Sequence, residues 1–265
     1  MTNLRSRSFI LSQYFKYWLK ATGSYSLHAP FIFQFFNSII SDRRIFYVFE
    51  EIENIRKKLI NNLDIIDVLD LGAGSQIIPG RERTISDIAG SSLSSPKFSQ
   101  FLFRLVLNRN PTNIVELGTS LGINTLYLAK ANSKTPVVTM EGCPNIAKIA
   151  VRNFEKMACE NITLVEGDID CNLELVLSRF NTIDFVYFDA NHTQEATLRY
   201  FELCLSKVNE NSIFVFDDIH LSIGMNKAWK LIKTNPIVAL SIDIFDAGII
   251  FFDKRLQKQD YILEF

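Results

Sequence analysis

From residue 113 onward, short apolar segments alternate with amphipathic segments of about 10 to 15 residues, which is the pattern of strands and helices in turn. The first five apolar segments are NIVEL, PVVTME, NITLVEG, IDFVYFD and SIFVFDD. Such repetition predicts a parallel sheet with helices on both faces. The last two, IVALSIDIF and GIIFF, are joined by the short DAG, which is too short for a crossover and predicts an antiparallel hairpin. We therefore expect a doubly wound α/β sheet of seven strands with the last strand antiparallel.

Composition limits the classes of protein that fit. The chain has 265 residues, is 48% hydrophobic and carries a formal net charge of -1, so it can build a large core and shows no general affinity for nucleic acid. No uninterrupted apolar run approaches the roughly 18 residues of a membrane span, and no cleavable leader is recognisable. We expect a cytoplasmic protein with no membrane partner. The cysteines form no C-x-x-C pair and are expected to be buried thiols: Cys143, Cys159, Cys171 and Cys204.

The first 65 residues are predicted to form a helical extension that acts as a lid or a dimer contact, followed by an α/β domain over residues 66–265. Residues 1–30 contain no Asp or Glu, and their basic residues are Arg5, Arg7, Lys16 and Lys20. One helical face carries Ile10, Tyr14, Tyr17, Trp18 and Ala21. This face is expected to pack on the main domain or on a second subunit of a homodimer; the alternative is a helix that binds RNA or a membrane surface.

Two apolar segments end in an acidic residue and a glycine turn: DVLDLGAGSQ at 67–76 and NIVELGTSLG at 113–122. In doubly wound sheets, a ligand held by such a turn also meets an acid at the end of the next strand, about 20 residues later. Glu141 follows Gly118 by 23 residues and ends a strand, whereas no strand follows the first turn. The second turn is therefore the predicted ligand site.

The first glycine segment is interpreted as an additional edge strand or a buried turn that presents Arg81 and Arg83 to an acidic acceptor. Two alternatives for this segment are a purely structural role and closure over the substrate.

The second turn does not fit a dinucleotide. Residues 118–122 read G-x-x-x-G rather than G-x-G-x-x-G, and Glu116 just before the turn would repel a pyrophosphate. A carboxylate there suits a ligand with cationic groups, such as S-adenosylmethionine with its ammonium and sulfonium. Asp168, after the third strand, could accept a bond from the adenine amino group, although a solvated turn residue would look the same.

Carboxylates also end the fourth and fifth strands, at Asp189 and at Asp217–Asp218. Adjacent parallel strands lie about 4.8 Å apart, so these side chains can converge. Three carboxylates repel one another unless a cation joins them, and Mg²⁺ prefers such oxygen ligands. The sequence therefore predicts a metal site at Asp189, Asp217 and Asp218.

Residues 113–252 resemble the class I S-adenosylmethionine-dependent methyltransferases, and among them the cation-dependent O-methyltransferases related to the catechol and caffeoyl-CoA enzymes. The segments that carry the resemblance are VELGTSLGINTLYLA, TMEGCP, LVEGD, DFVYFDANH and IFVFDD. The resemblance implies a Rossmann-like sheet in which the methionine part, the ribose and the adenine are bound in turn. It assigns the cofactor to Glu116, Gly118, Thr119, Ser120, Gly122, Glu141, Gly142, Asp168 and Asp189.

These enzymes place an Asp after strand four and an Asp-Asn pair after strand five, where this sequence has Asp189 and Asp217–Asp218. Their catalytic Lys lies three residues after the first metal Asp, a position held here by His192. The resemblance therefore implies His192 as general base, with Asp189 beside it. A helix-start residue that only bonds Asp189 is the alternative for His192, and ordinary packing is the better interpretation of His220.

The sequence thus predicts an enzyme that transfers a methyl group from S-adenosylmethionine to an oxygen of a small molecule, assisted by a divalent metal. An RNA or protein methyltransferase that docks through its basic N-terminal helix is one alternative, and a non-catalytic S-adenosylmethionine-binding module is another. A dehydrogenase is disfavoured by the absence of G-x-G-x-x-G. The sequence does not name the acceptor, because acceptor specificity resides in loops.

Overall fold

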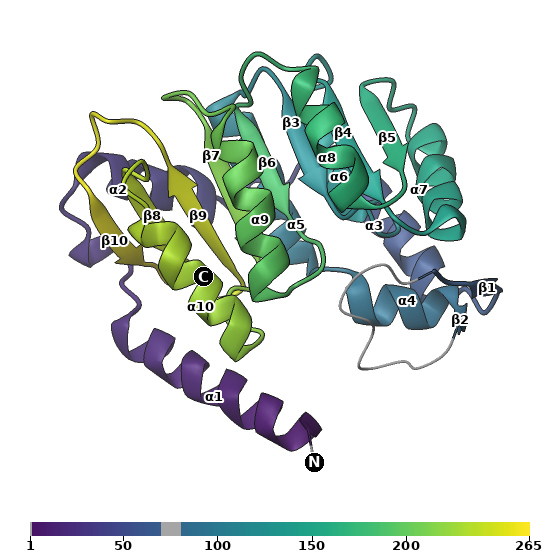
Figure 1. Ribbon diagram of the computed structural model, residues 1–265, viewed down its shortest axis with the longest axis horizontal. Helices are drawn as coiled ribbons and strands as arrows, with labels where there is room; N and C mark the ends of the chain where they lie inside the picture. The colour runs from purple at the N-terminus through teal and green to yellow at the C-terminus, as the bar shows by residue number, and fades with distance from the viewer. Residues whose placement is uncertain (1, 70–80) are drawn as a thin grey trace. The chain divides into compact units, whose positions relative to one another are not determined.

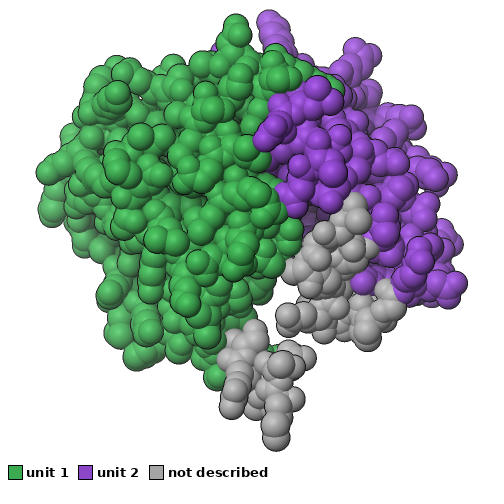
Figure 2. Space-filling view, viewed as in Figure 1, with its two compact units in different colours: residues 1–41, 177–265 green, residues 42–176 purple. Residues whose placement is uncertain are grey.

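The computed structural model describes the backbone of residues 2–69 and 81–265, and side chains from residue 7 onward within these ranges. The chain forms two compact units, shown in different colours in Figure 2. One unit contains residues 42–176, and the other contains residues 1–41 and 177–265.

The unit of residues 42–176 holds three parallel strands in the order β3-β4-β5, with β3 paired to β4 and β4 to β5. Helix α5 packs against α6, and α3 contacts α4 and α6. Its elements are α3 (Tyr47–Ile60), β1 (Ile65–Asp67), β2 (Glu82–Thr84), α4 (Ile85–Ser92), α5 (Pro96–Arg109), β3 (Ile114–Leu117), α6 (Ile123–Ala131), β4 (Val137–Glu141), α7 (Pro144–Lys156), β5 (Ile162–Glu166) and the first turns of α8 (Ile169–Ser178).

Local sequence explains where these helices begin. Thr84 caps α4 by accepting the backbone N–H of Asp87, and Ser95 caps α5 by accepting that of Phe98. Helices α5 and α7 both start with a proline, whose fixed φ suits the first helical position. The buried faces of α5 and α6 are almost wholly apolar, so packing supplies most of their stability.

The other unit holds five strands in the order β10-β8-β9-β7-β6 (Figure 1). Strand β6 is parallel to β7, whereas β9 is antiparallel to both β7 and β8. Helices α9 and α10 lie on the near face of these strands in Figure 1. The elements are α1 (Thr2–Lys20), η1 (Ser24–Ser26), α2 (Pro30–Phe35), η2 (Phe36–Ile40), β6 (Phe185–Phe188), α9 (Gln194–Leu205), β7 (Ile213–Asp217), α10 (Ile223–Thr234), β8 (Leu240–Asp243), β9 (Ala247–Phe251) and β10 (Gln259–Ile262).

The predicted fold class is confirmed. All seven predicted segments contain strands, β3 to β9, and the β8–β9 pair is the predicted antiparallel hairpin. Helix α10 and strand β10 were not predicted; β10 pairs in parallel with β8 at the edge of the sheet. Among the described residues, no helix is long and apolar enough to cross a membrane.

The first glycine segment does not add a strand to the main sheet within the described residues. Strand β1 pairs with β2 in a separate two-stranded antiparallel sheet. Gly72 and Gly74 lie outside the described residues, so their predicted turn is not described.

The N-terminal region is helical, as predicted, although its residues belong to both compact units. Tyr14 and Tyr17 of α1 contact Phe245, with ring centroids 5.0 and 5.4 Å away. Phe31 contacts Phe251 edge-on, and α3 belongs to the other unit. The domain boundary at residue 65 and the homodimer stay predictions. The cysteines are free, but Cys171 is exposed and Cys159 half-buried, so the expectation of four buried thiols was wrong for these two.

Candidate active site

The predicted ligand turn connects β3 to α6 through an unusual backbone. Gly118 and Gly122 have φ values of 100° and 81°, and Ser120 has 48°. At Gly122 an added Cβ would lie 2.5 Å from the ring of Phe154, so both the conformation and the space require glycine. The backbone N–H groups of Gly118 and Thr119 both donate to the carbonyl of Met140. The turn is therefore fixed against the carboxyl end of β4.

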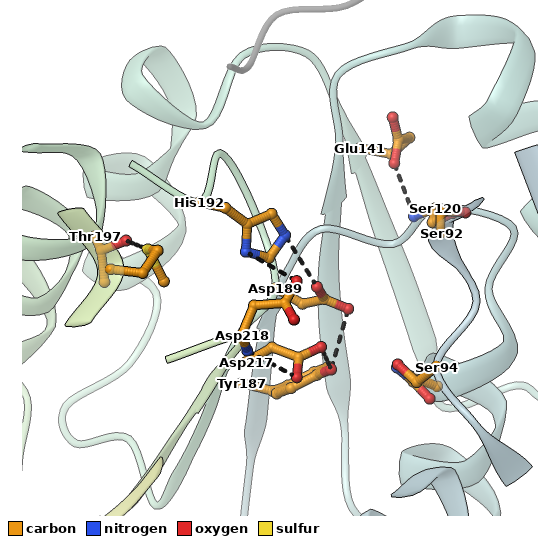
Figure 3. A network of polar contacts seen from close by, with 12 residues as sticks. Ser92, Ser94, Ser120, Glu141, Tyr187, Asp189, His192, Thr197, Asp217 and Asp218 are labelled. Atoms are coloured by element: carbon orange, nitrogen blue, oxygen red, sulfur yellow. Dashed lines mark hydrogen bonds and ion pairs between the residues drawn. The ribbon is translucent and has the colours of Figure 1, made fainter. Parts of the chain in front are cut away.

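Glu141 ends β4 and holds the turn directly (Figure 3). Its Oε2 accepts the backbone N–H of Ser120 at 2.8 Å, and its Oε1 accepts that of Cys143 at 2.9 Å. The carboxylate is half-buried, as is Gly142 beside it. An acid that is fixed at a strand end and still reaches solvent can accept bonds from vicinal hydroxyls of a sugar.

Glu116 lies beneath the turn and is fully buried. Its Oε2 accepts bonds from the hydroxyls of Thr125 at 2.5 Å and Thr139 at 2.6 Å, and Thr139 also bonds Thr119. These contacts join β3, β4, α6 and the turn through one carboxylate. Glu116 thus supports the turn from inside the protein; its predicted contact with the methionine part stays a prediction.

Asp168 follows β5 and opens α8. Its Oδ1 accepts the backbone N–H of Asp170 at 2.9 Å, which is a capping bond. The preceding Gly167 has a φ of 120° and donates its N–H to the carbonyl of Glu141 at 2.8 Å. Asp168 and Glu141 therefore lie at the carboxyl ends of two paired strands, as the sequence predicted.

Polar residues of α4, of α5 and of the link between them, which the sequence analysis did not identify, also contact this turn or the helix after it. Ser92 bonds the hydroxyl of Ser120 at 2.8 Å (Figure 3). Asn124, in the first turn of α6, bonds Ser94 at 2.9 Å and Ser99 at 2.7 Å. In the sequence, the signal for these contacts is the Ser-rich segment at 91–95, and a segment of this composition predicts only a loop.

The start of the first glycine segment lies beside the end of β4. The carbonyl of Asp67 accepts a bond from Asn145 at 2.8 Å, and the N–H of Leu69 donates to the sulfur of Cys143 at 3.3 Å. Arg81 forms a 3.3 Å ion pair with Asp67. The proposed role of Arg81 and Arg83 toward an acidic acceptor stays a prediction.

A second polar group lies at the carboxyl ends of β6 and β7, in the other unit (Figure 3). Asp217 ends β7, and Asp189 and Asp218 follow β6 and β7. The hydroxyl of Tyr187 bonds Oδ2 of Asp217 at 2.8 Å and Oδ2 of Asp189 at 3.1 Å. Tyr187 was missed, although strand alternation places it on the same face as Asp189, two residues later.

His192 contacts two of the carboxylates. Its Nε2 lies 3.4 Å from Oδ1 of Asp189, and its Nδ1 lies 3.8 Å from Oδ2 of Asp218. The imidazole is 27% exposed as a whole, whereas its Nδ1 is buried. Asn191, His192 and Asp218 all have positive φ values, of 64°, 36° and 55°. Such strain in neighbouring residues is typical of functional sites, where the surrounding structure imposes it.

The carboxylates of this group shift the pKa values of His192 and Asp217. Burial works to lower the pKa of His192, but the hydrogen bond with Asp189 and the charges of Asp218 and Asp189 raise it above its ordinary value. Burial, with the nearby charges of Asp189 and Asp218, raises the pKa of Asp217 well above its usual range. The surroundings therefore favour the charged form of the His192 imidazole and the protonated form of the Asp217 carboxyl.

This arrangement does not fit the predicted metal site. Three carboxylates have suitable chemistry for Mg²⁺. However, within the described ranges no three or more His, Cys, Asp or Glu side chains are grouped so that they could hold a metal ion. The physical reason is that Tyr187 connects Asp189 to Asp217 and His192 lies against Asp189 and Asp218, so a phenol and an imidazole join the carboxylates.

His220 takes no part in this group. Its Nε2 lies 2.9 Å from a carboxylate oxygen of Asp243, its Nδ1 lies 2.9 Å from the amide of Asn226, and its ring stacks on Phe245. Both ring nitrogens are thus satisfied, which supports the interpretation of His220 as a packing residue.

Comparison with known proteins supports the resemblance. Residues 115–219, which contain every predicted site residue, match a family described as "Methyltransferase domain". Protein-L-isoaspartate O-methyltransferase 1 of Archaeoglobus fulgidus is 28% identical over 99 residues, which cover 34% of this chain and 46% of that protein. Catechol O-methyltransferase of Niastella koreensis is 27% identical over 128 residues, which cover 47% of this chain and 57% of that protein. The chain thus spans about half the length of these curated relatives.

An O-methyltransferase from Bacillus cereus, solved in complex with S-adenosylhomocysteine, has a similar fold. Its TM-score is 0.55 at 19% identity, and the match covers 82% of this chain and 96% of that one. The fold and the matched domain together confirm the predicted resemblance to class I methyltransferases.

Proposed function

We propose that this chain, whose residues 115–219 match a methyltransferase domain, transfers a methyl group from S-adenosylmethionine to an oxygen of a small-molecule acceptor. The observation that carries the proposal is the pair of bonds that fix Glu141 between the Gly118–Gly122 turn and Cys143. In doubly wound sheets an acid at the end of this strand would accept bonds from the sugar hydroxyls of a nucleoside, and the fixed position of Glu141 supports this role. The complex of the Bacillus cereus enzyme with S-adenosylhomocysteine supports the identity of the nucleoside.

The turn and the ends of β4 and β5 would each bind a different part of the cofactor. Glu141, with Gly142 beside it, would accept bonds from the ribose hydroxyls, and Asp168 would accept one from the adenine amino group. The backbone of residues 118–122 would approach the methionine part, held in position from below by Glu116. When bound, S-adenosylmethionine supplies a methyl group made electrophilic by the sulfonium.

His192 would take the proton of the acceptor hydroxyl as the oxygen gains the methyl group. The products are then the methylated acceptor, S-adenosylhomocysteine and an imidazolium, which later returns the proton to water. Asp189 and Asp218 would stabilise that imidazolium, as their effect on the pKa of His192 indicates. Tyr187 would orient Asp189 through its 3.1 Å bond. In this reaction the protein mainly supplies alignment and a proton acceptor.

The sequence also predicts that Mg²⁺ assists the reaction. The chemistry of the three carboxylates supports this prediction, but their arrangement does not. Because His192 and Tyr187 connect Asp189, Asp217 and Asp218, we derive no step through a metal.

A protein acceptor is the second candidate, because relatives of 28% identity are protein-L-isoaspartate O-methyltransferases. The two candidates differ in where the methyl group goes. With radiolabelled S-adenosylmethionine, we expect label in small catechols, phenols or carboxylic acids and none in peptides that contain isoaspartyl residues. Label in such peptides alone would favour the second candidate.

Calorimetric titration with S-adenosylmethionine and with NAD tests the cofactor directly. We expect saturable binding of S-adenosylmethionine and none of NAD. Absence of S-adenosylmethionine binding would overturn the proposal. Binding without any turnover across the acceptors would instead favour a binding module that lacks catalysis.

A further inference from the structure

Helix α1 carries a second apolar face, distinct from the one that packs on its own unit. Tyr14 and Tyr17 are turned toward Phe245, and the Tyr17 hydroxyl donates to the carbonyl of Leu263 at 2.6 Å. The other face carries Leu11, Phe15, Trp18 and Leu19, which we call the α1 stripe. These side chains are 69%, 58%, 63% and 61% exposed.

The α1 stripe is continuous. Its residues are separated by four, three and one positions, which places them on one side of a helix. The rings of Phe15 and Trp18 stack, with centroids 6.2 Å apart. Isolated exposed apolar residues need no explanation, but a contiguous aromatic and aliphatic patch indicates an interaction surface.

The charged side chains of α1 all have the same sign. No Asp or Glu occurs in the first 41 residues, whereas Arg7, Lys16 and Lys20 lie on α1 and are exposed. On a helical projection, Lys16 and Arg7 flank the stripe on its two sides. The acids Asp243 and Asp246 act on Tyr17 and so belong to the packed face.

We propose that α1 binds the surface of a membrane that contains anionic lipids, with the α1 stripe inserted among the headgroups and acyl chains. The argument is complementarity. Aromatic and aliphatic side chains on one face, flanked by lysine and arginine, are the features of helices that lie in a bilayer interface. The lysines would extend their ammonium groups to lipid phosphates while their methylenes contact apolar surface. The sequence analysis gave a membrane surface only as an alternative partner of this helix.

A second copy of the chain fits this surface less well. Two α1 helices that met through their stripes would bring Arg7, Lys16 and Lys20 of both copies together, with no acid on α1 to balance them. Like charges across an interface oppose association, whereas an anionic bilayer neutralises them. The observations therefore favour a lipid surface over a homodimer through this face.

Vesicle binding by the full chain tests the proposal. We expect co-sedimentation with vesicles of phosphatidylcholine and phosphatidylglycerol, weak binding to phosphatidylcholine alone, and release by salt. Trp18 reports insertion, because the only other tryptophan, Trp229, is buried. Its emission should shift to shorter wavelength on binding and be quenched by brominated lipids.

Two variants locate the binding surface. The double change Phe15→Ser/Leu19→Ser keeps Trp18 and should weaken partitioning about tenfold or more, because it removes inserted apolar area. Lys16→Gln/Lys20→Gln, which leaves the stripe intact, should weaken binding about tenfold to anionic vesicles only. Leu175→Ser/Leu231→Ser removes two equally exposed leucines elsewhere and should change nothing. Circular dichroism and thermal unfolding verify the fold of each variant.

The following results would overturn the proposal: no binding of the wild type to anionic vesicles, equal binding to neutral ones, or undiminished binding by the stripe variant. A wild-type dimer that Phe15→Ser/Leu19→Ser converts to a monomer, without vesicle binding, would assign the stripe to a second copy. Binding to single-stranded RNA but not to vesicles would assign the basic residues to nucleic acid.

Discussion

Glu141 accepts the backbone N–H of Ser120 at 2.8 Å, so the acid that ends one strand holds the turn that follows the neighbouring strand. The same carboxylate accepts the N–H of Cys143 at 2.9 Å. A residue predicted only as a ligand for ribose therefore also builds the site that would receive the ribose. Its removal should affect both binding and the position of the turn.

Glu141→Ala should weaken S-adenosylmethionine binding by about tenfold to a hundredfold, because hydrogen bonds to a charged group contribute about 1.5–3 kcal/mol. Titration calorimetry measures the loss. Glu166→Ala is the matched control: Glu166 ends β5, pairs in register with Glu141 and is exposed. Equal affinity in the two variants would contradict the proposed cofactor site.

Gly122→Ala should lower the free energy of unfolding by about 1–3 kcal/mol, because the residue has a positive φ and the new Cβ would collide with Phe154. Gly90→Ala is the control, since no atom lies within 4 Å of its Cβ position and it lies within α4. Alanine there should raise the free energy of unfolding by about 0.5–1 kcal/mol. Urea unfolding compares them; a stable Gly122→Ala would show that the turn adapts without strain.

The sheet was predictable from sequence because its strands are short apolar runs separated by helices with buried stripes. Strand β10 was not, because its sequence QDYI is half polar and its residues are exposed or half-buried. Such an edge strand is specified by its backbone pairing with β8 rather than by an apolar pattern. For α10 the sequence does carry a signal, because its buried residues Met225, Ala228, Trp229 and Ile232 recur at helical spacing.

In the site, the sequence identified acids and glycines but not their neighbours. The positions of Glu141 and Asp189 follow from strand ends, which a periodic pattern reveals. Glu116 of β3 is bonded by Thr125, which lies on α6, and by Thr139, which lies on β4. A lone threonine in the sequence gives no signal of such a contact. Likewise, the sequence could not show that Tyr187 and His192 contact the carboxylates, because these contacts depend on side-chain orientation.

Turnover should depend on pH through His192. As a base the imidazole must be neutral, so the rate should rise with pH through a pKa that Asp189 and Asp218 raise above its ordinary value. Asp189→Asn removes one of these charges and should move the acid limb of the profile to lower pH while reducing kcat. The measurement is kcat against pH for both forms.

Asp243→Asn is the control for that profile, because Asp243 contacts His220 instead. It should leave the position of the acid limb unchanged. If the limb moved in Asp243→Asn and not in Asp189→Asn, the titrating base would not be His192.

Removal of metal ions should leave most of the turnover intact. The physical reason is that the charges of Asp189 and Asp218 face the imidazole of His192, while the hydroxyl of Tyr187 bonds Asp189 and Asp217. Enzyme treated with EDTA and dialysed should therefore keep its kcat, and added Mg²⁺ should change it less than about twofold, below the effect expected of a metal that stabilises the transition state.

S-adenosylmethionine affinity, measured with and without Mg²⁺, controls for an effect of EDTA on cofactor binding. Loss of turnover in EDTA that Mg²⁺ restores, at unchanged cofactor affinity, would show that the carboxylates rearrange around a metal during the reaction. In that case Asp218→Asn, which gives the Asp-Asn pair of the cation-dependent enzymes, should retain the Mg²⁺ response, while Asp217→Ala should lose it.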